Sequence, residues 1–237
     1  MSKTKIKFEF TGETMEFFGH TLRRIVCVTA FGSIAAGQIG GWIESEKNLK
    51  QVSGNAWVYG DAKVYGDAEV YGNAEVYGNA EVYGDAEVYG DAKVYGDAKV
   101  YGNAEVYGNA EVYGNAEVAG NAWVYGNAEV YGDAEVYGDA EVYGNAEVYG
   151  DAKVYGCTIL RTGVTKTSTD FVVIGPQGSR NSFATYHIES NTICTGCFMG
   201  SLNAFSEKVT LVYGDNEYKA QYQRAIQVFE MYQKKGK

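Results

Sequence analysis

The residues best suited to binding chemistry lie in a short glycine-rich loop near the C-terminus. The sequence there reads GPQGSRN, residues 175–181. Glycines expose backbone N–H groups, Arg180 can pair with an anion, and neighbouring polar side chains add hydrogen bonds. The spacing predicts a small anion- or ligand-binding site formed by Gly178, Ser179, Arg180, Asn181 and, on the following strand, His187. A loop of this kind is also typical of a plain structural turn, which is the interpretation we favour.

The C-x-x-C pair Cys194 and Cys197 is the second candidate. One such pair supplies half of a tetrahedral zinc site, which Cys157 or His187 could complete. The sequence has no second C-x-x-C pair, and these two cysteines lie in an apolar, strand-like stretch. We therefore interpret them as buried reduced thiols and expect no bound metal, with redox chemistry as a further alternative.

These candidates are positioned by a chain whose middle is a repeat. The hexad A-[EK]-V-Y-G-[DN] recurs eighteen times between Val52 and Val154. On an extended segment alternate side chains face opposite sides, so Ala and Val share one face while Glu or Lys and Tyr share the other. Gly and the Asp or Asn after it tolerate positive φ and favour a tight corner. Each hexad is predicted to be a four-residue strand followed by a bend.

A four-residue strand cannot bury its own apolar face, so we expect the hexads to stack as coils of a parallel β-solenoid. Three hexads per coil enclose a narrow triangular interior that Ala and Val fill, and eighteen hexads give about six coils. This period assigns the outward charged positions to three rows, and only the second mixes charges well. Sixteen tyrosines are expected to stack in ladders beside them. The rows are Trp57, Glu75, Lys93, Glu111, Glu129, Glu147; Lys63, Glu81, Lys99, Glu117, Glu135, Lys153; and Glu69, Glu87, Glu105, Trp123, Glu141, Ile159.

The charge of the chain is unevenly distributed. The formal net charge is −10, but residues 52–159 carry 11 Glu, 8 Asp and 4 Lys, which gives −15, and both ends are slightly basic. An acidic rod disfavours direct contact with nucleic acid or an anionic membrane and favours a protein partner or self-association as a homo-oligomer.

The N-terminus lacks the apolar core of a signal peptide, and four cysteines are too few for a disulfide framework. We therefore expect a reducing compartment, either the cytoplasm or the inside of an infected cell.

The spacing V-x-x-x-A-x, as in Val64 to Glu69, resembles the hexapeptide repeat of left-handed β-helices. The resemblance implies a left-handed coil. That superfamily includes acyltransferases and zinc carbonic anhydrases, whose chemistry generally needs histidines at coil edges. The chain has only His20 and His187, both outside the repeats. A three-histidine zinc site in one chain is thus excluded, and acyl transfer in the solenoid lacks its usual base.

The two ends are expected to be caps, because an open solenoid exposes backbone groups at both ends. Residues 1–51 are predicted to form an N-terminal β cap. In it, Gly40 and Gly41 allow a close approach, and Trp42 with Ile43 seals the bottom of the prism.

After the solenoid, residues 52–159, the chain is predicted to continue through a polar link into a small α+β domain, residues 160–237. Ser201 is a good N-cap for a short helix, and a longer helix is expected from about Asn216 to Lys234.

The segments GHTLRRI and GQIGGWIESEKNL before the hexads, and IGPQGSRNSFATYH and CTGCFMGSLNAF after them, resemble a group of bacterial and phage-encoded hexapeptide proteins. With the hexads, the resemblance spans most of the chain. It implies a cap–solenoid–cap plan and a phage or prophage origin, and it implies no particular activity.

We therefore predict a mainly β protein: a left-handed triangular parallel β-helix of about six coils with an N-terminal β cap and a small C-terminal α+β domain. The predicted function is non-enzymatic, that of a rigid acidic rod that presents its end domains to protein partners, with no catalytic residues and no cofactor. Two alternatives remain open. One is an acidic nucleic-acid mimic that binds a basic enzyme, and the other is a hexapeptide-type acyltransferase or small-ligand-binding protein.

Overall fold

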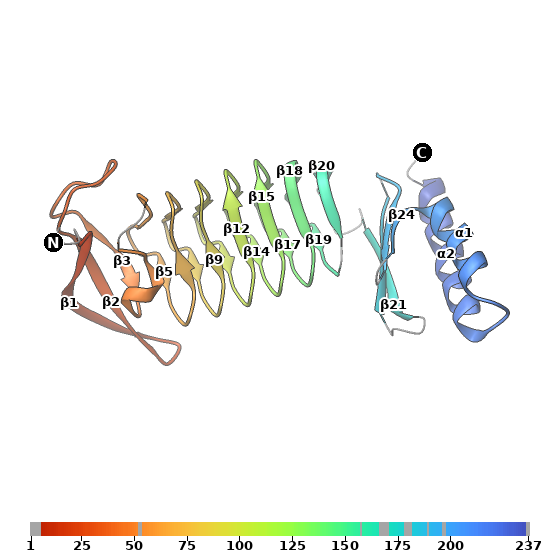
Figure 1. Cartoon of the computed structure of the whole chain (residues 1–237), viewed down its shortest axis with the longest axis horizontal. Coiled ribbons are helices and arrows are strands. Elements are labelled where there is room, and N and C mark those ends of the chain that lie inside the picture. Colours follow the sequence, from red (N-terminus) through yellow and green to blue (C-terminus); the bar gives the residue numbers. More distant parts are fainter. Residues whose placement is uncertain are drawn as a thin grey trace, which may run out of the picture.

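The computed structural model describes residues 6–51, 54–156, 158–165, 171–177, 182–188, 190–195 and 198–235. The structure is mainly β and has three parts. These are an N-terminal β cap, a six-turn parallel β-solenoid, and a C-terminal sheet with two helices. Figure 1 shows the three parts arranged in a line. The predicted fold class is confirmed in this form.

The period of the solenoid is eighteen residues. Lys99 pairs in parallel with Glu117 and Val100 with Val118, and the same offset holds from coil to coil. Three hexads therefore complete one coil, and the three predicted rows of outward residues are confirmed. The three walls are called faces A, B and C.

Face A contains β4 (Trp57–Val58), β7 (Glu75–Val76), β10 (Lys93–Val94), β13 (Glu111–Val112), β16 (Glu129–Val130) and the end of β18 (Glu141–Val148). Face B contains β5 (Lys63–Val64), β8 (Glu81–Val82), β11 (Lys99–Val100), β14 (Glu117–Val118), β17 (Glu135–Val136) and β19 (Lys153–Val154). Face C contains β6 (Glu69–Val70), β9 (Glu87–Val88), β12 (Glu105–Gly108), β15 (Trp123–Gly126), the start of β18, and β20 (Ile159–Thr165).

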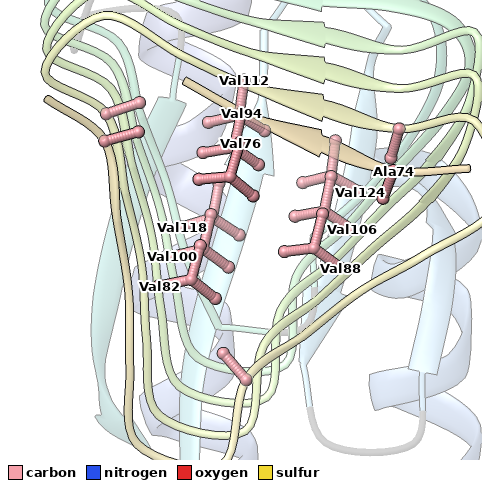
Figure 2. Packing of buried hydrophobic residues seen from close by; sticks show 14 of the residues in the cluster. Ala74, Val76, Val82, Val88, Val94, Val100, Val106, Val112, Val118 and Val124 are labelled. Carbon is pink, nitrogen blue, oxygen red and sulfur yellow. The ribbon is translucent and has the colours of Figure 1, made fainter. Parts of the chain in front are cut away.

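The interior of the solenoid is filled by alanine and valine. Every Val of the repeat from Val58 to Val154 has no exposed surface, and the alanines at the inward hexad position are equally buried. Figure 2 shows the valines of the three faces as three columns that point into a triangular interior. Each valine lies directly above the valine of the preceding coil, so the core is one continuous hydrophobic column.

The strands are shorter than predicted. Most of them span two residues, Glu or Lys and the following Val, where four were expected. The ladder nevertheless continues round each corner, where Asp97 N–H donates to Gly114 O at 2.8 Å. Gly102 shows why glycine is needed: its φ is +72°, and a Cβ there would lie 3.0 Å from the backbone N of Gly120. Among the described hexads only Gly takes positive φ, whereas the Asp or Asn after it does not.

The N-terminal cap is an antiparallel hairpin that extends face B. The strands β1 (Phe8–Phe17) and β2 (His20–Cys27) pair with each other, and β2 pairs with β3 (Ile39–Ile43). The strand β3 then pairs in parallel with β5 and so supplies face B of an incomplete first coil.

The bottom of the prism is sealed by residues brought together from the cap and the first coil. Ile43 is fully buried, as expected, but Trp42 points outward, where Arg24 lies over its ring at 4.9 Å. Trp42 follows the outward row because it pairs with Lys63. The indole that closes the core is instead Trp57, which packs edge-on against Phe8 and Phe31. The expected close approach at Gly40 and Gly41 is confirmed, since a Cβ at either would lie 2.6 Å from a side-chain carbon.

Face C of the incomplete first coil is formed without a hexad. The short 3-10 helix η1 (Glu46–Asn48) leads to Leu49, which bridges to Val70. The buried Asn48 side-chain amide donates to Gly66 O at 3.0 Å and to Ala68 O at 2.9 Å. One side chain thus satisfies two carbonyls on the lower edge of the first complete coil.

The C-terminal part is a four-stranded antiparallel sheet covered by two helices. Its strands are β21 (Phe171–Gln177), β22 (Ser182–His187), β23 (Thr192–Thr195) and β24 (Phe198–Ser201). The helices are α1 (Leu202–Val212), which the Ser201 hydroxyl caps as predicted, and α2 (Glu217–Lys235). Their apolar faces pack on the sheet around Tyr186 and Phe229.

The solenoid continues into the segment that we predicted to be a polar link. The strand β20 pairs first with the face C part of β18 and then with its face A part, so it turns one more corner. At the last glycine corner a Cβ on Gly156 would lie 3.2 Å from the Thr185 hydroxyl oxygen. The sheet of the C-terminal part therefore lies against the end of the coil.

Candidate functional site

The predicted ligand loop falls only partly within the described residues. Gly178, Ser179, Arg180 and Asn181 lie outside them. His187 lies at the end of β22 and is 5% exposed. The Ser190 N–H donates to His187 Nδ1 at 3.3 Å, and the Ser190 hydroxyl lies 2.6 Å from the same nitrogen. Because Nδ1 accepts from a backbone N–H, this nitrogen serves a local turn.

The predicted reduced state of Cys194 is wrong. Cys194 is disulfide-bonded, whereas Cys27 is a free, buried thiol. Cys157 and Cys197 lie outside the described residues. A disulfide sulfur is not the thiolate that zinc binds. Within the described part of the chain, no three His, Cys, Asp or Glu residues are grouped so that they could hold a metal ion.

A cluster of polar groups in the N-terminal cap was not predicted from the sequence. Both Glu44 carboxylate oxygens lie 3.0 Å from His20 Nδ1, and one of them accepts the Gly66 N–H at 2.7 Å. Burial alone would raise the Glu44 pKa, but the hydrogen bonds from His20 and Gly66 hold this pKa below its ordinary value. Because the cluster joins β2 to the first coil, its geometry is that of a structural clasp.

The largest regular feature of the surface is the set of outward charge rows. On face C the row is acidic at Glu69, Glu87, Glu105 and Glu141, with Trp123 between the last two. Trp123 is 41% exposed, although Trp57 at the same hexad position is fully buried under the N-terminal cap. Like charges one coil apart repel one another only modestly in water. Face C is therefore a mainly acidic stripe that carries one exposed indole.

Lysines interrupt the acidic rows on the other two faces. Lys93 lies 3.0 Å from Glu111 on face A. On face B, Lys99 lies 3.4 Å from Glu117, and Lys153 lies 2.8 Å from Glu135. The side chains of these pairs are between 30% and 46% exposed, so each pair contributes little to stability. They matter more for the pattern of charge that the rod offers to a partner.

Tyrosine ladders run beside the charge rows. Successive rings are parallel within 11° along most of each ladder, with centroids 4.7–5.1 Å apart. Many phenols donate to a glutamate of the next coil, as Tyr95 does to Glu111 at 2.9 Å. The predicted ladders are confirmed. On face B, Ala119 takes the place of a tyrosine and separates the stacked pair Tyr83–Tyr101 from the pair Tyr137–Tyr155. Rings and carboxylates together cover the outside of the ladder of backbone hydrogen bonds.

We expect the tyrosine ladders to resist ionisation in alkali. Burial, followed by the nearby carboxylates, raises the pKa of Tyr59, Tyr101 and Tyr125 to about 12, from an ordinary value of 10. Raised folded-state values contribute stability that is complete below pH 10 and is lost as the pH rises toward 12. At pH 11 the near-ultraviolet phenolate absorbance of the folded protein should be far below that of the urea-unfolded protein. Equal absorbance of the two states would contradict the ladder geometry.

One open polar depression adjoins face A. It has a volume of about 370 Å³ and lies between the cap loop at Ser33 and the first coils. Its charges already have partners, because Lys93 pairs with Glu111 and the Asn73 amide donates to Asp91 at 2.9 Å. Its lining residues are Gly32, Ser33, Asn55, Asn73, Glu75, Asp91 and Lys93. This set offers hydrogen bonds to a small polar molecule and lacks a histidine base.

None of the helices among the described residues is both long and apolar enough to span a bilayer. Comparison of the chain with models of known protein families, and with curated proteins, finds no match.

Proposed function

We propose that the protein is a non-enzymatic interaction rod, in which the solenoid holds two end parts at a fixed distance and offers regular outward rows to protein partners. The observation that carries the proposal is the unbroken ladder from Trp57 to Val154, in which no loop leaves the coil. Such a ladder fixes distance and orientation but brings no catalytic side chains together. With the hexapeptide resemblance, the proposal includes a left-handed coil and a phage or prophage origin.

Cross-linking mass spectrometry on the full chain, captured from a bacterial host, tests this proposal. We expect a protein partner whose cross-links map to the end parts or to the outward rows, with no small-molecule turnover by the purified protein. The matched controls are His187→Ala in the C-terminal sheet and Glu105→Gln on the rod. A substrate-dependent turnover that His187→Ala removes and Glu105→Gln leaves intact would overturn the proposal.

Face C favours a second candidate function, that of an acidic mimic of a nucleic-acid backbone. Glu69, Glu87 and Glu105 are spaced by one coil, about 4.8 Å, and Glu141 follows two coils after Glu105. A groove lined with Lys and Arg could bind this row by charge. The test is retention of basic DNA-binding enzymes on immobilised protein at low salt. Salt should release them steeply, and replacing Glu87, Glu105 and Glu141 by Gln should abolish retention. Retention by the triple variant equal to that of the wild type would remove this candidate.

A further inference from the structure

The charges of face B have an order that the other two faces lack. Above the first coil the outward row reads Glu81, Lys99, Glu117, Glu135 and Lys153. Counted from Glu117, each residue on one side has the opposite charge to the residue at the same distance on the other side. Lys99 thus mirrors Glu135, and Glu81 mirrors Lys153.

A row of this kind is complementary to itself when a second rod lies against it in the opposite direction. A two-fold axis at Glu117 places Lys99 opposite Glu135 of the second copy, and Lys153 opposite Glu81 of the second copy. By symmetry each pairing occurs twice, which gives four attractive contacts. Centring the axis one coil lower, at Lys99, would instead place Glu81 opposite Glu117, which repel. On face A, an axis at Glu111 would place Glu75 opposite Glu147, and these also repel.

The gap in the tyrosine ladder lies in the same coil as the centre of this pattern. Ala119 directly follows β14, which ends at Val118, and takes the place of the tyrosine found in the other described coils of the repeat. At a two-fold axis, each residue faces the same residue of the second copy. A small side chain at that position leaves room for the two rods to approach each other. In each copy the Glu117 carboxylate accepts hydrogen bonds from Lys99 and from the Tyr101 hydroxyl, which both lie one coil earlier. The carboxylate is therefore directed toward the earlier coil. In antiparallel rods the two Glu117 carboxylates are thus directed in opposite directions along the length of the rods.

The part of face B that carries the pattern is also the part that the cap leaves open. The hairpin β1–β2 folds over the first position of the row, where Lys63 lies 4.8 Å from the Phe17 ring centroid and Tyr65 is only 5% exposed. Lys99 and Lys153 are 42% and 46% exposed. The accessible stretch thus coincides with the five residues that are complementary.

We propose that the protein pairs with a second copy of itself, antiparallel, through face B, with the two-fold axis at Glu117 and Ala119. The inference rests on the proposed function, because it names one partner of the interaction rod. The patch spans five coils that lie about 4.8 Å apart, and its width is that of a strand of about four residues at ~3.3 Å per residue. The contact area is therefore small. This patch is below the standard size for a stable interface, so the dimer should be weak, concentration-dependent and sensitive to salt.

Sedimentation velocity of the full chain from micromolar to near-millimolar concentration tests the pairing. We expect a monomer–dimer equilibrium that Lys99→Glu weakens at least tenfold, because one substitution reverses two contacts. The double variant Lys99→Glu with Glu135→Lys restores opposite charges and should restore dimerisation. The matched control is Glu105→Lys on face C, which should leave the equilibrium unchanged.

Ala119→Tyr separates folding from pairing. The new ring completes the ladder between Tyr101 and Tyr137, so the melting temperature should be maintained or raised, while two rings at the two-fold axis should abolish the dimer. A protein that is monomeric throughout the range, a dimer that ignores Lys99→Glu, or a double variant that does not recover would each overturn the pairing. A protein that stays monomeric but still captures a host protein through its end parts would contradict this inference and would support the proposed function.

Discussion

Val106→Asp should unfold the solenoid at far lower denaturant than the wild type tolerates. Val106 is fully buried in the face C column, between Val88 and Val124, among side chains that offer no hydrogen bonds (Figure 2). A carboxylate there loses its water without gaining a partner, which costs about 4 kcal/mol or more. Chemical denaturation followed by far-ultraviolet circular dichroism measures the change.

The matched control for this substitution is its immediate neighbour. Glu105→Gln changes an outward, partly exposed residue of the same strand and removes one phenol–carboxylate contact, that with Tyr89. Its effect should stay within about 1 kcal/mol. Equal unfolding midpoints for Val106→Asp and Glu105→Gln would show that the two positions do not differ in burial, which the triangular coil requires.

Deletion of one whole coil should leave a folded, shorter rod. Removing residues 88–105 joins Glu87 to Val106 and restores an intact hexad, so each remaining coil keeps its neighbours in register. Because repeat stability is close to a sum of nearest-neighbour terms, cooperative unfolding should persist. The rod should shorten by about 4.8 Å, measured as the distance between spin labels at Phe18 and Leu211, both 84% exposed.

Deletion of six residues should have a different effect. Removing residues 100–105 also restores a hexad but shifts everything after it by one face, so the C-terminal part should rotate by a third of a turn relative to the cap. Removing only residues 103–105 breaks the alternation and should prevent folding. If the eighteen-residue deletion unfolds while the six-residue deletion does not, the assignment of three hexads to a coil is wrong.

Local patterns explain why the solenoid could be predicted from sequence. Because Ala and Val alternate in the hexads with outward residues, mostly Glu or Lys and Tyr, one rule assigns the inside and the outside of each described coil. The eighteen-residue period then places Lys99 beside Glu117 without any further information. The Ser201 cap of α1 is equally local, since its hydroxyl accepts the Ala204 N–H three residues away.

The features that escaped prediction depend on contacts between distant segments. Trp57 and Trp123 occupy the same place in the hexad, yet one is buried and the other exposed, because the N-terminal hairpin folds over the first coil only. Trp42 lies outside the prism because its pairing with Lys63 fixes the alternation of β3. No periodic pattern in residues 1–51 contains that pairing.

The candidate sites were predictable only in part for the same reason. The sequence identified His187 as a polar residue beside the glycine loop, and its hydrogen bonds to Ser190 depend on a turn that the sequence does not specify. The disulfide at Cys194 depends on distance between sulfurs, which a C-x-x-C spacing alone leaves open. The charge order of face B, by contrast, follows from the sequence alone once the eighteen-residue period fixes which residues are neighbours on that face.

The two hydrogen bonds from Asn48 have a consequence for how the chain finds its alignment. Neighbouring hexads are nearly identical, so a strand displaced by one coil would make almost the same contacts. The contacts within the repeats therefore do not favour the correct register over a slipped one. Asn48 is not part of a hexad and joins the cap to one corner only, through Gly66 and Ala68. The cap thus acts as a template. If coils form one after another from the cap during synthesis, each strand pairs with the correct preceding coil, and the register of the whole solenoid is set at Asn48.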